Sequence, residues 1–193
     1  MRLGRAAVAG GAALLAGIAA LSWMNRVEPA VDPGGPGPTG PAGPIDAGWR
    51  VSRVVDGDTI KVTRNGEQLT VRLIGIDTPE TVKPDAPVEC YGPQASQFAK
   101  DLLDGSEVVL EADPSQQSTD RYGRTLAYVW LVDAGSMSSM FKVSSMFNLQ
   151  AVRSGAAREA TYDGPYQWQQ ILRDAQDEAR AQGRGLWGSC DAP

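Results

Sequence analysis

The chain has 193 residues, with 18 lysines and arginines against 23 aspartates and glutamates, two cysteines and no histidine. The absence of histidine excludes Ser-His-Asp and Cys-His catalytic sites, and it removes histidine as a metal ligand or proton carrier. Acid–base chemistry must therefore come from carboxylates, Lys, Tyr, Cys or metal-bound water, and an oxygen-only metal site favours hard cations such as Ca²⁺ or Mg²⁺. The net charge of −5 argues against a protein that holds nucleic acid by bulk attraction alone.

The first 28 residues have the layout of an export signal. Arg2 and Arg5 precede an uncharged run over residues 6–23, which has 18 residues, 11 of them Ala or Gly. A basic start followed by an apolar run is typical of a secretory signal or a signal-anchor, although this run is marginal in length and hydrophobicity for a membrane span. A cleaved signal and an uncleaved anchor with the N-terminus inside are equally compatible with the pattern, and a buried Ala-rich core helix is a less favoured alternative.

A linker is predicted over residues 29–48, where six prolines alternate with glycines. Such a segment has almost no apolar surface to bury and cannot offset the entropy of ordering. We expect it to act as a semi-extended spacer that holds a folded domain away from a membrane. Residues 49–193 form the predicted globular domain, which contains 15 basic and 20 acidic side chains and is long enough to bury a core.

The globular domain is predicted to have an α+β fold that is mainly β. Alternating apolar residues between turn signals such as Asp56-Gly57 and Asn65-Gly66 predict five strands: 51–55, 59–62, 69–76, 108–112 and 125–132. Apolar residues at helical spacing predict three helices: one from Gly92-Pro93 to Gly105, one over 147–153, and one that begins near 163–165 and ends at Gly183. This order is typical of a five-stranded OB-fold barrel with three packed helices.

Three short stretches gather acids, arginines and turn residues: Asp56-Gly57-Asp58-Thr59, then Arg72 with Asp77-Thr78-Pro79-Glu80, and then Asp120-Arg121-Tyr122-Gly123-Arg124. Each one alone is better explained as a turn, a strand end or a polar loop. In a meander barrel, however, the turn after the first strand and the end of the third strand lie close together. Asp58, Asp77 and Glu80 would then repel one another unless a cation lies between them. A cation, a carboxylate base and two arginines form a complete set for phosphodiester hydrolysis without histidine.

Together these stretches resemble the staphylococcal nuclease family over about residues 50–188. The resemblance extends to Tyr91-Gly92-Pro93-Gln94-Ala95 and Gly185-Leu186-Trp187, which follow in the family's order and spacing. It implies an OB-fold nuclease that uses Ca²⁺ to cleave DNA and RNA. The implied products carry 3′-phosphate and 5′-hydroxyl ends.

The resemblance also implies a role for each matching residue. Asp58 and Asp77 match carboxylate ligands of Ca²⁺, Thr78 matches the ligand that offers its backbone carbonyl, and Asp56 lies behind them. Glu80 matches the carboxylate that orients or deprotonates the attacking water. Arg72 and Arg124 match the arginines that stabilise the five-coordinate transition state. The remaining matches are Arg121 and Tyr122, which contact a terminal phosphate of the nucleotide, and Tyr162, a base-side tyrosine.

Three features depart from the family pattern. The domain is acidic, whereas the well-known secreted member is strongly basic, so we expect weaker and less salt-sensitive substrate binding. Residues 133–145 are rich in Ser and Met and longer than the family's connection, which predicts a mobile loop or a partner surface. Cys90 precedes the first predicted helix and Cys190 follows the last, and in an exported protein this favours one disulfide over two free thiols.

We therefore expect a monomeric calcium-dependent nuclease that is secreted, or tethered outside the cytoplasmic membrane by residues 6–23. Two alternatives stay open. One is a barrel of the same family that binds nucleic acid or protein without catalysis, and the other is an envelope protein that acts through the Ser/Met-rich segment. The first is disfavoured because such modules usually lose the acids and arginines that are all present here.

Overall fold

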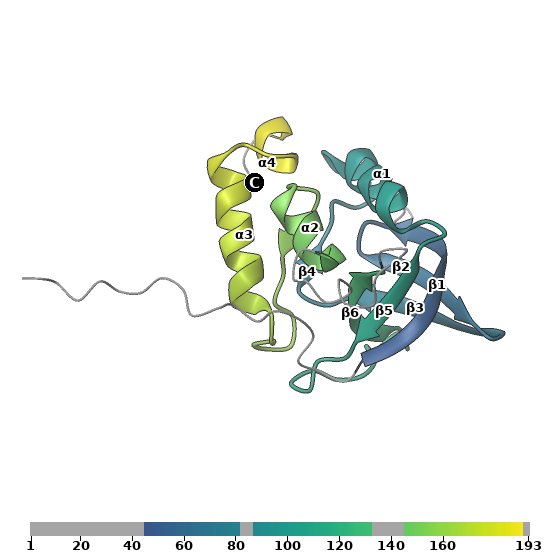
Figure 1. Cartoon of the computed structure of the whole chain (residues 1–193). Helices are drawn as coiled ribbons and strands as arrows, with labels where there is room; N and C mark the ends of the chain where they lie inside the picture. The colour runs from purple at the N-terminus through teal and green to yellow at the C-terminus, as the bar shows by residue number, and fades with distance from the viewer. Residues whose placement is uncertain (1–44, 82–86, 133–144, 191–193) are drawn as a thin grey trace, which may run out of the picture. The chain divides into compact units, whose positions relative to one another are not determined.

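The computed structural model describes residues 45–81, 87–132 and 145–190. In this part of the chain, strands close into a barrel in the order β1-β2-β3-β6-β5 (Figure 1). The neighbouring strands are antiparallel except for β3 and β6, which pair in parallel from Val71–Thr125 to Leu73–Ala127. This closed mixed barrel confirms the predicted OB-fold. Its strands are β1 (Ile45–Asp56), β2 (Thr59–Arg64), β3 (Glu67–Leu73), β5 (Glu107–Glu111) and β6 (Thr125–Leu131).

Two tight turns set the register of the first three strands. Asn65 and Gly66 have φ angles of 50° and 87°, the left-handed conformation that a two-residue hairpin turn requires. At the other turn Asp56 pairs with Thr59, so Gly57 and Asp58 form the tip. A Cβ added at Gly57 would lie 2.6 Å from the side chain of Thr78, and this close contact places the first acidic turn directly against the second acidic stretch.

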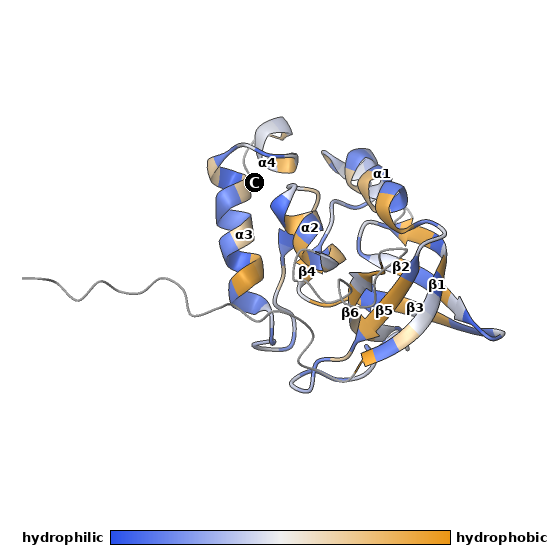
Figure 2. Ribbon diagram, viewed as in Figure 1, coloured by the Kyte–Doolittle hydropathy of each residue, from blue (hydrophilic) through white to orange (hydrophobic). Residues whose placement is uncertain are grey.

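The predicted helices pack against the barrel and against one another. α1 (Gly92–Leu103) buries Ala95, Ala99 and Leu103, and α3 (Gln169–Ala181) buries a stripe of Leu172, Ala175 and Ala179. Hydrophobic residues dominate the barrel strands β5 and β6, whereas α3 is mostly hydrophilic outside its stripe (Figure 2). α2 (Phe147–Arg153) lies where it was predicted, and a short helix that was not predicted, α4 (Leu186–Ser189), follows α3.

A fully buried carboxylate joins the start of α3 to the barrel. Glu111, at the end of β5, accepts hydrogen bonds from the indole nitrogens of Trp130 and Trp168 at 2.8 and 3.2 Å, and from the amide of Gln167 at 3.0 Å. Three donors on one buried carboxylate offset the loss of its hydration. The segment before α3 is therefore held firmly beside the loop that follows β5.

The third strand ends earlier than predicted, at Leu73 instead of 76. Gly75 turns the chain with a φ of 76°, and a Cβ there would lie 2.6 Å from the ring of Tyr166. The next two residues form a separate strand, β4 (Ile76–Asp77), which pairs with β7 (Arg158–Glu159). The break places Asp77 on this second, two-stranded sheet instead of on the barrel strand that carries Arg72.

Two other boundaries differ from the prediction. β1 begins at Ile45, inside the range expected for the linker, because Ile45 and Asp46 pair with the end of β5. α3 begins at Gln169 and not near residues 163–165, because the chain before it is held by Glu111.

Several predicted segments lie outside the described residues. They are the signal or anchor with its apolar run over residues 6–23, the linker up to residue 44, and residues 133–144 of the Ser/Met-rich segment. Within the described ranges, no helix has both the length and the apolarity that a membrane span requires.

Candidate active site

The guanidinium of Arg72 joins the first two acidic stretches. Arg72 lies on β3 and is 9% exposed. Its Nη1 donates hydrogen bonds to the carbonyl oxygens of Leu73 and Ile76 at 2.9 and 2.8 Å, which anchors the turn between β3 and β4. Its Nη2 lies 3.2 Å from Asp58 Oδ2 and 3.2 Å from Asp77 Oδ1. Two carboxylates, one from the turn between β1 and β2 and one from β4, therefore converge on one nitrogen.

The Asp58 carboxylate is oriented by its neighbours. Its Oδ1 accepts a hydrogen bond from the Thr59 hydroxyl at 2.9 Å, and its Oδ2 accepts one from the backbone N–H of Thr78 at 3.2 Å. The backbone N–H of Asp58 in turn donates to Asp56 Oδ1 at 3.2 Å. Asp56 thus supports the turn that carries Asp58. Thr78 contacts the same turn, through its hydrogen bond to Asp58 and through its side chain against Gly57.

The carboxylates of this cluster perturb one another. Burial, followed by the negative charge of Asp58, raises the pKa of Asp56 to about 7. Burial also raises the pKa of Asp77 and outweighs the hydrogen bond from Tyr162, which lowers it; the charge of Asp58 raises this pKa further, against the charge of Arg72. Burial and the neighbouring negative charge thus both oppose ionisation of Asp56 and Asp77.

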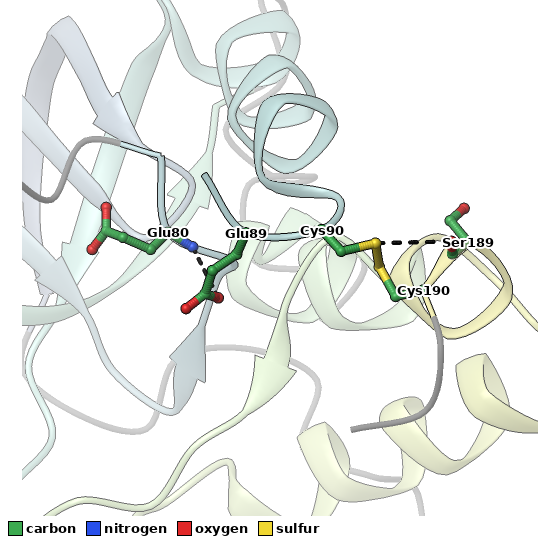
Figure 3. Close-up of a disulfide and its surroundings, with 5 residues drawn as sticks. All are labelled: Glu80, Glu89, Cys90, Ser189 and Cys190. Atoms are coloured by element: carbon green, nitrogen blue, oxygen red, sulfur yellow. Dashed lines mark hydrogen bonds between the residues drawn. A yellow bond between two sulfur atoms is a disulfide. The ribbon is translucent and has the colours of Figure 1, made fainter. Parts of the chain in front are cut away.

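Glu80 lies on the same side of the site. Its charge contributes to the raised pKa of Asp56, which places the two carboxylates within electrostatic reach. Glu80 Oε1 accepts a hydrogen bond from the backbone N–H of Thr81 at 2.9 Å. The backbone of Glu80 is paired with Glu89, a residue that the sequence pattern did not single out (Figure 3).

The third predicted stretch forms a compact loop before β6. Asp120 Oδ1 accepts the backbone N–H groups of Tyr122 and Arg124 at 2.9 and 3.0 Å, and its Oδ2 accepts Arg124 Nε at 2.6 Å. The guanidinium of Arg121 lies 4.8 Å from the ring centre of Tyr122 and donates to its hydroxyl at 2.7 Å. Asp120, which the sequence reading did not assign, therefore orients Arg124.

A cavity of about 500 Å³ brings this loop together with Arg72. Five predicted residues contribute to its wall: Arg72, Arg121, Tyr122, Arg124 and Tyr162. Asp58, Asp77 and Glu80 do not line this cavity. Arg72 is thus shared between an acidic cluster and a cavity that holds the other two arginines.

Tyr162, the predicted base-side tyrosine, contacts both Asp77 and Arg72. Its hydroxyl donates to Asp77 Oδ1 at 2.8 Å and accepts from Arg72 Nη2 at 3.1 Å, and its ring centre is 5.5 Å from the guanidinium. Burial, together with the nearby Asp77, raises the pKa of Tyr162 to about 12 although Arg72 opposes the shift. The side chain is still 66% exposed, so one face of its ring is open to a ligand.

The predicted disulfide is present between Cys90 and Cys190, whose Cα atoms lie 5.9 Å apart although 100 positions separate them in the sequence (Figure 3). It joins the segment before α1 to the end of α4. In the described residues it accounts for both cysteines.

A metal ion would have to be held by few protein ligands. In residues 45–81, 87–132 and 145–190, no three Asp, Glu or Cys side chains are grouped closely enough to form a metal site by themselves. Asp58 and Asp77 converge on Arg72 and could supply two carboxylates, and Thr78, whose backbone N–H donates a hydrogen bond to Asp58, is the third predicted ligand. These are oxygen ligands only, and they suit a hard divalent cation.

Comparisons with known proteins identify the family of this chain. A family model described as "Staphylococcal nuclease homologue" matches residues 70–189. The chain is 43% identical over 141 residues to a thermonuclease of Staphylococcus hyicus, covering 73% of this chain and 76% of the relative. It is 43% identical over 137 residues to a thermonuclease of Staphylococcus intermedius (71% and 74%) and 36% identical over 138 residues to endonuclease YncB of Bacillus subtilis (71% and 60%). The chain belongs to the staphylococcal nuclease family.

Proposed function

We propose that this chain is an endonuclease that hydrolyses phosphodiester bonds of DNA and RNA with the help of a bound Ca²⁺ ion. The observation that carries the proposal is the position of Arg72 Nη2, 3.2 Å from both Asp58 and Asp77. Hydrolysis of a phosphodiester needs a cationic donor that stabilises negative charge on the phosphate and carboxylates that can hold a metal ion. Arg72 provides the first, and the two convergent aspartates provide the second. The relatives named thermonuclease and endonuclease support the same activity.

The cation would be held by Asp58, Asp77 and the carbonyl of Thr78. The raised pKa values of Asp56 and Asp77 support this assignment, because a cation favours the ionised carboxylates that burial, and to a smaller extent the charge of Asp58, disfavour. Ca²⁺ accepts oxygen ligands in flexible geometry and completes its shell with water, so two carboxylates and a carbonyl are compatible with it. When bound, the ion supplies positive charge that polarises a phosphoryl oxygen.

The arginines stabilise the charge that grows on the phosphate during the reaction. Arg72 is positioned by two backbone carbonyls, and Arg124 is positioned by Asp120, so neither side chain must be ordered when the substrate binds. Such fixed donors are effective because they are already aligned with the developing charge. Removing one typically lowers the rate by a factor on the order of 10²–10³.

Glu80 is the acceptor for the proton of the attacking water. As the water oxygen bonds to phosphorus, its proton passes to the Glu80 carboxylate, which Thr81 orients through Oε1. The bond from phosphorus to the 5′ oxygen then breaks, and that oxygen leaves as a hydroxyl after taking up a proton. The products carry 3′-phosphate and 5′-hydroxyl ends.

The tyrosines extend the site to the neighbouring nucleotides. Tyr122 and Tyr162 line the cavity and are 67% and 66% exposed, so their ring faces can stack against unpaired bases. Arg121 lies beside Tyr122 and offers a contact to a phosphate. The proposed enzyme therefore prefers single-stranded substrate.

The proposal also places the domain outside the cytoplasm, secreted or anchored. The Cys90–Cys190 disulfide supports this placement, because such bonds persist mainly in oxidising compartments. The basic start and the apolar run over residues 6–23 support it as well. The enzyme acts as a monomer in the proposal, since one chain supplies every residue assigned to the reaction.

Degradation of single-stranded DNA tests the proposed function. Activity is measured with Ca²⁺, with Mg²⁺ and with EGTA, for the wild type, for Glu80→Gln, and for Glu107→Gln as a matched exposed control. We expect activity only with Ca²⁺, a loss of roughly 10²-fold or more in Glu80→Gln, and 5′-hydroxyl ends on the products. Activity that is indifferent to EGTA and to Glu80→Gln would refute the assigned site, and DNA binding without cleavage would favour the non-catalytic module.

A further inference from the structure

The backbone of Glu80 is held from one side by a single neighbouring residue. Glu80 donates its N–H to Glu89 Oε2 at 3.2 Å, and its carbonyl accepts the N–H of Glu89 at 3.0 Å (Figure 3). This reciprocal pair binds both polar groups of the Glu80 peptide backbone. The direction in which the Glu80 side chain leaves the backbone therefore depends on where Glu89 lies.

The chain after Glu89 closes tightly over the same point. Gly92 donates its N–H to the carbonyl of Glu89 at 3.0 Å, which bends the segment back on itself. A Cβ added at Gly92 would lie 3.0 Å from the Glu80 carbonyl oxygen and 2.8 Å from the side chain of Thr81. Residues 89–92, which we call the clamp, thus contact the Glu80 backbone through hydrogen bonds and through direct packing.

The hydrogen bonds alone are too weak to fix the clamp. Glu89 is exposed, so water competes for its carboxylate, and each such bond contributes only about 0.5–1.5 kcal/mol. A segment with exposed hydrogen bonds and few apolar contacts opens readily. At its C-terminal end the clamp continues into α1, whose buried face packs on the barrel, and a second attachment holds it next to Glu89.

The disulfide supplies that attachment. Cys90, inside the clamp, is bonded to Cys190 directly after α4. α4 is itself docked: Leu186 is buried and donates its N–H to the carbonyl of Gly155 at 2.9 Å, next to the end of α2. A Cβ at Gly185 would lie 2.4 Å from that same carbonyl oxygen, so the two backbones are in direct contact. The clamp is therefore tied to a rigid part of the domain.

The geometry points to Glu89 as a positioning residue for Glu80, held in place by the Cys90–Cys190 disulfide. The inference rests on the proposed function, in which Glu80 receives the proton of the attacking water. The disulfide then has a catalytic consequence beyond stability, because it determines how well a group 10 positions earlier in the chain is oriented. A displacement of about 1 Å at a catalytic group can lower a rate by roughly 10²-fold.

The test uses the full chain and five variants. Glu89→Ala removes the acceptor for the Glu80 N–H, whereas Glu89→Gln keeps an oxygen acceptor at the same place. The double variant Cys90→Ser/Cys190→Ser releases the clamp. Glu67→Ala is the matched control for loss of an exposed glutamate, and Val109→Ala is a control that lowers stability in the barrel core.

Two experiments are done at a temperature where circular dichroism shows every variant folded. Steady-state kinetics gives kcat and KM for single-stranded DNA with Ca²⁺, and NMR gives the hydrogen-exchange rate of the Glu80 amide. In Glu89→Ala and in the double cysteine variant, we expect kcat to fall about tenfold, KM to stay within about twofold, and the Glu80 amide to exchange at least about tenfold faster. Glu89→Gln and both controls are expected to keep kcat within about threefold of the wild type.

Wild-type kcat and unchanged Glu80 exchange in Glu89→Ala or in the double cysteine variant would overturn the inference. An equal loss of kcat in Val109→Ala would also overturn it, because stability alone would then explain the effect. A wild type that cleaves nothing under any metal condition would instead refute the proposed function. The exchange of the Glu80 amide is still read in those proteins, and unaltered exchange there overturns the clamp independently.

Discussion

Replacing Arg72 with lysine separates the two roles that the structure gives its guanidinium. Nη1 donates to the carbonyl oxygens of Leu73 and Ile76, which hold the turn between β3 and β4. Nη2 faces Asp58 and Asp77, and the side chain also lines the cavity that holds Arg121 and Arg124. Lysine keeps the positive charge, but its single ammonium nitrogen cannot occupy both positions.

The expected magnitudes follow from these contacts. The lysine nitrogen can satisfy one of the two carbonyls, so the protein loses about one hydrogen bond from a charged donor, or roughly 1.5–3 kcal/mol of unfolding free energy. The lysine nitrogen also cannot donate two hydrogen bonds to a phosphate in the bidentate manner of a guanidinium. Loss of one fixed donor to the developing negative charge lowers kcat by a factor on the order of 10²–10³.

Urea unfolding and DNA cleavage with Ca²⁺ measure the two effects in the same protein. Arg53→Lys is the matched control, because Arg53 is an exposed arginine on another strand of the same barrel, β1. Cleavage is assayed well below the unfolding midpoint, so that loss of folded protein does not lower the rate. A kcat within about threefold of the wild type would show that the forked guanidinium is not required, and an unchanged midpoint would contradict its role in anchoring the turn.

Three further changes test other contacts. Tyr162→Phe removes the hydroxyl that bridges Arg72 and Asp77 but keeps the ring, so we expect kcat to fall about threefold to tenfold. An unchanged kcat would show that the hydroxyl does not contribute to the reaction. For Asp113, burial opposes ionisation, but hydrogen bonds from the Tyr128 hydroxyl and neighbouring N–H groups outweigh it and lower the pKa below 3.8. The ionised carboxylate therefore stabilises the fold above that pH. The free energy of unfolding in urea should be larger for the wild type than for Asp113→Asn at neutral pH, and this difference should disappear as the pH falls from about 5 to about 2. A difference that stays constant with pH would contradict this. Because the described lining of the cavity holds three arginines, the slope of log affinity against log salt for single-stranded DNA should be about −2, and a slope steeper than about −4 would indicate a wider basic surface.

Features that depend on local turn chemistry could be predicted from the sequence. Asn65-Gly66 and Asp56-Gly57 have the residues that tight hairpin turns require, and both turns are present. The same local order placed Asp58 opposite Thr78, because the hairpin register and the strand that follows leave little freedom between them. The acidic cluster was therefore predictable as soon as a meander barrel was assumed.

Features that depend on distant partners could not be predicted in this way. The third strand ends early because Gly75 meets Tyr166, which lies 91 positions later. Apolar alternation continues past Leu73, so the pattern alone favours a longer strand. The contact of Tyr162 with Arg72 spans 90 positions, and the pairing of Glu89 with Glu80 depends on a loop whose sequence carries no periodic signal.

Net charge proved a weaker guide to binding than the distribution of charges around Arg72. The chain carries −5 overall, and the carboxylates of Asp56, Asp58 and Asp77 account for part of that value on one side of this arginine. On the other side, the cavity wall holds Arg121 and Arg124. Salt screens exposed charges beyond about 8 Å at physiological ionic strength. A phosphate in the cavity would meet the three arginines of its wall together with Asp120 and Asp163, which line the same wall. Asp58 and Asp77 lie 3.2 Å from Arg72 and are not screened from it, whereas more distant acidic residues chiefly reduce non-specific attraction.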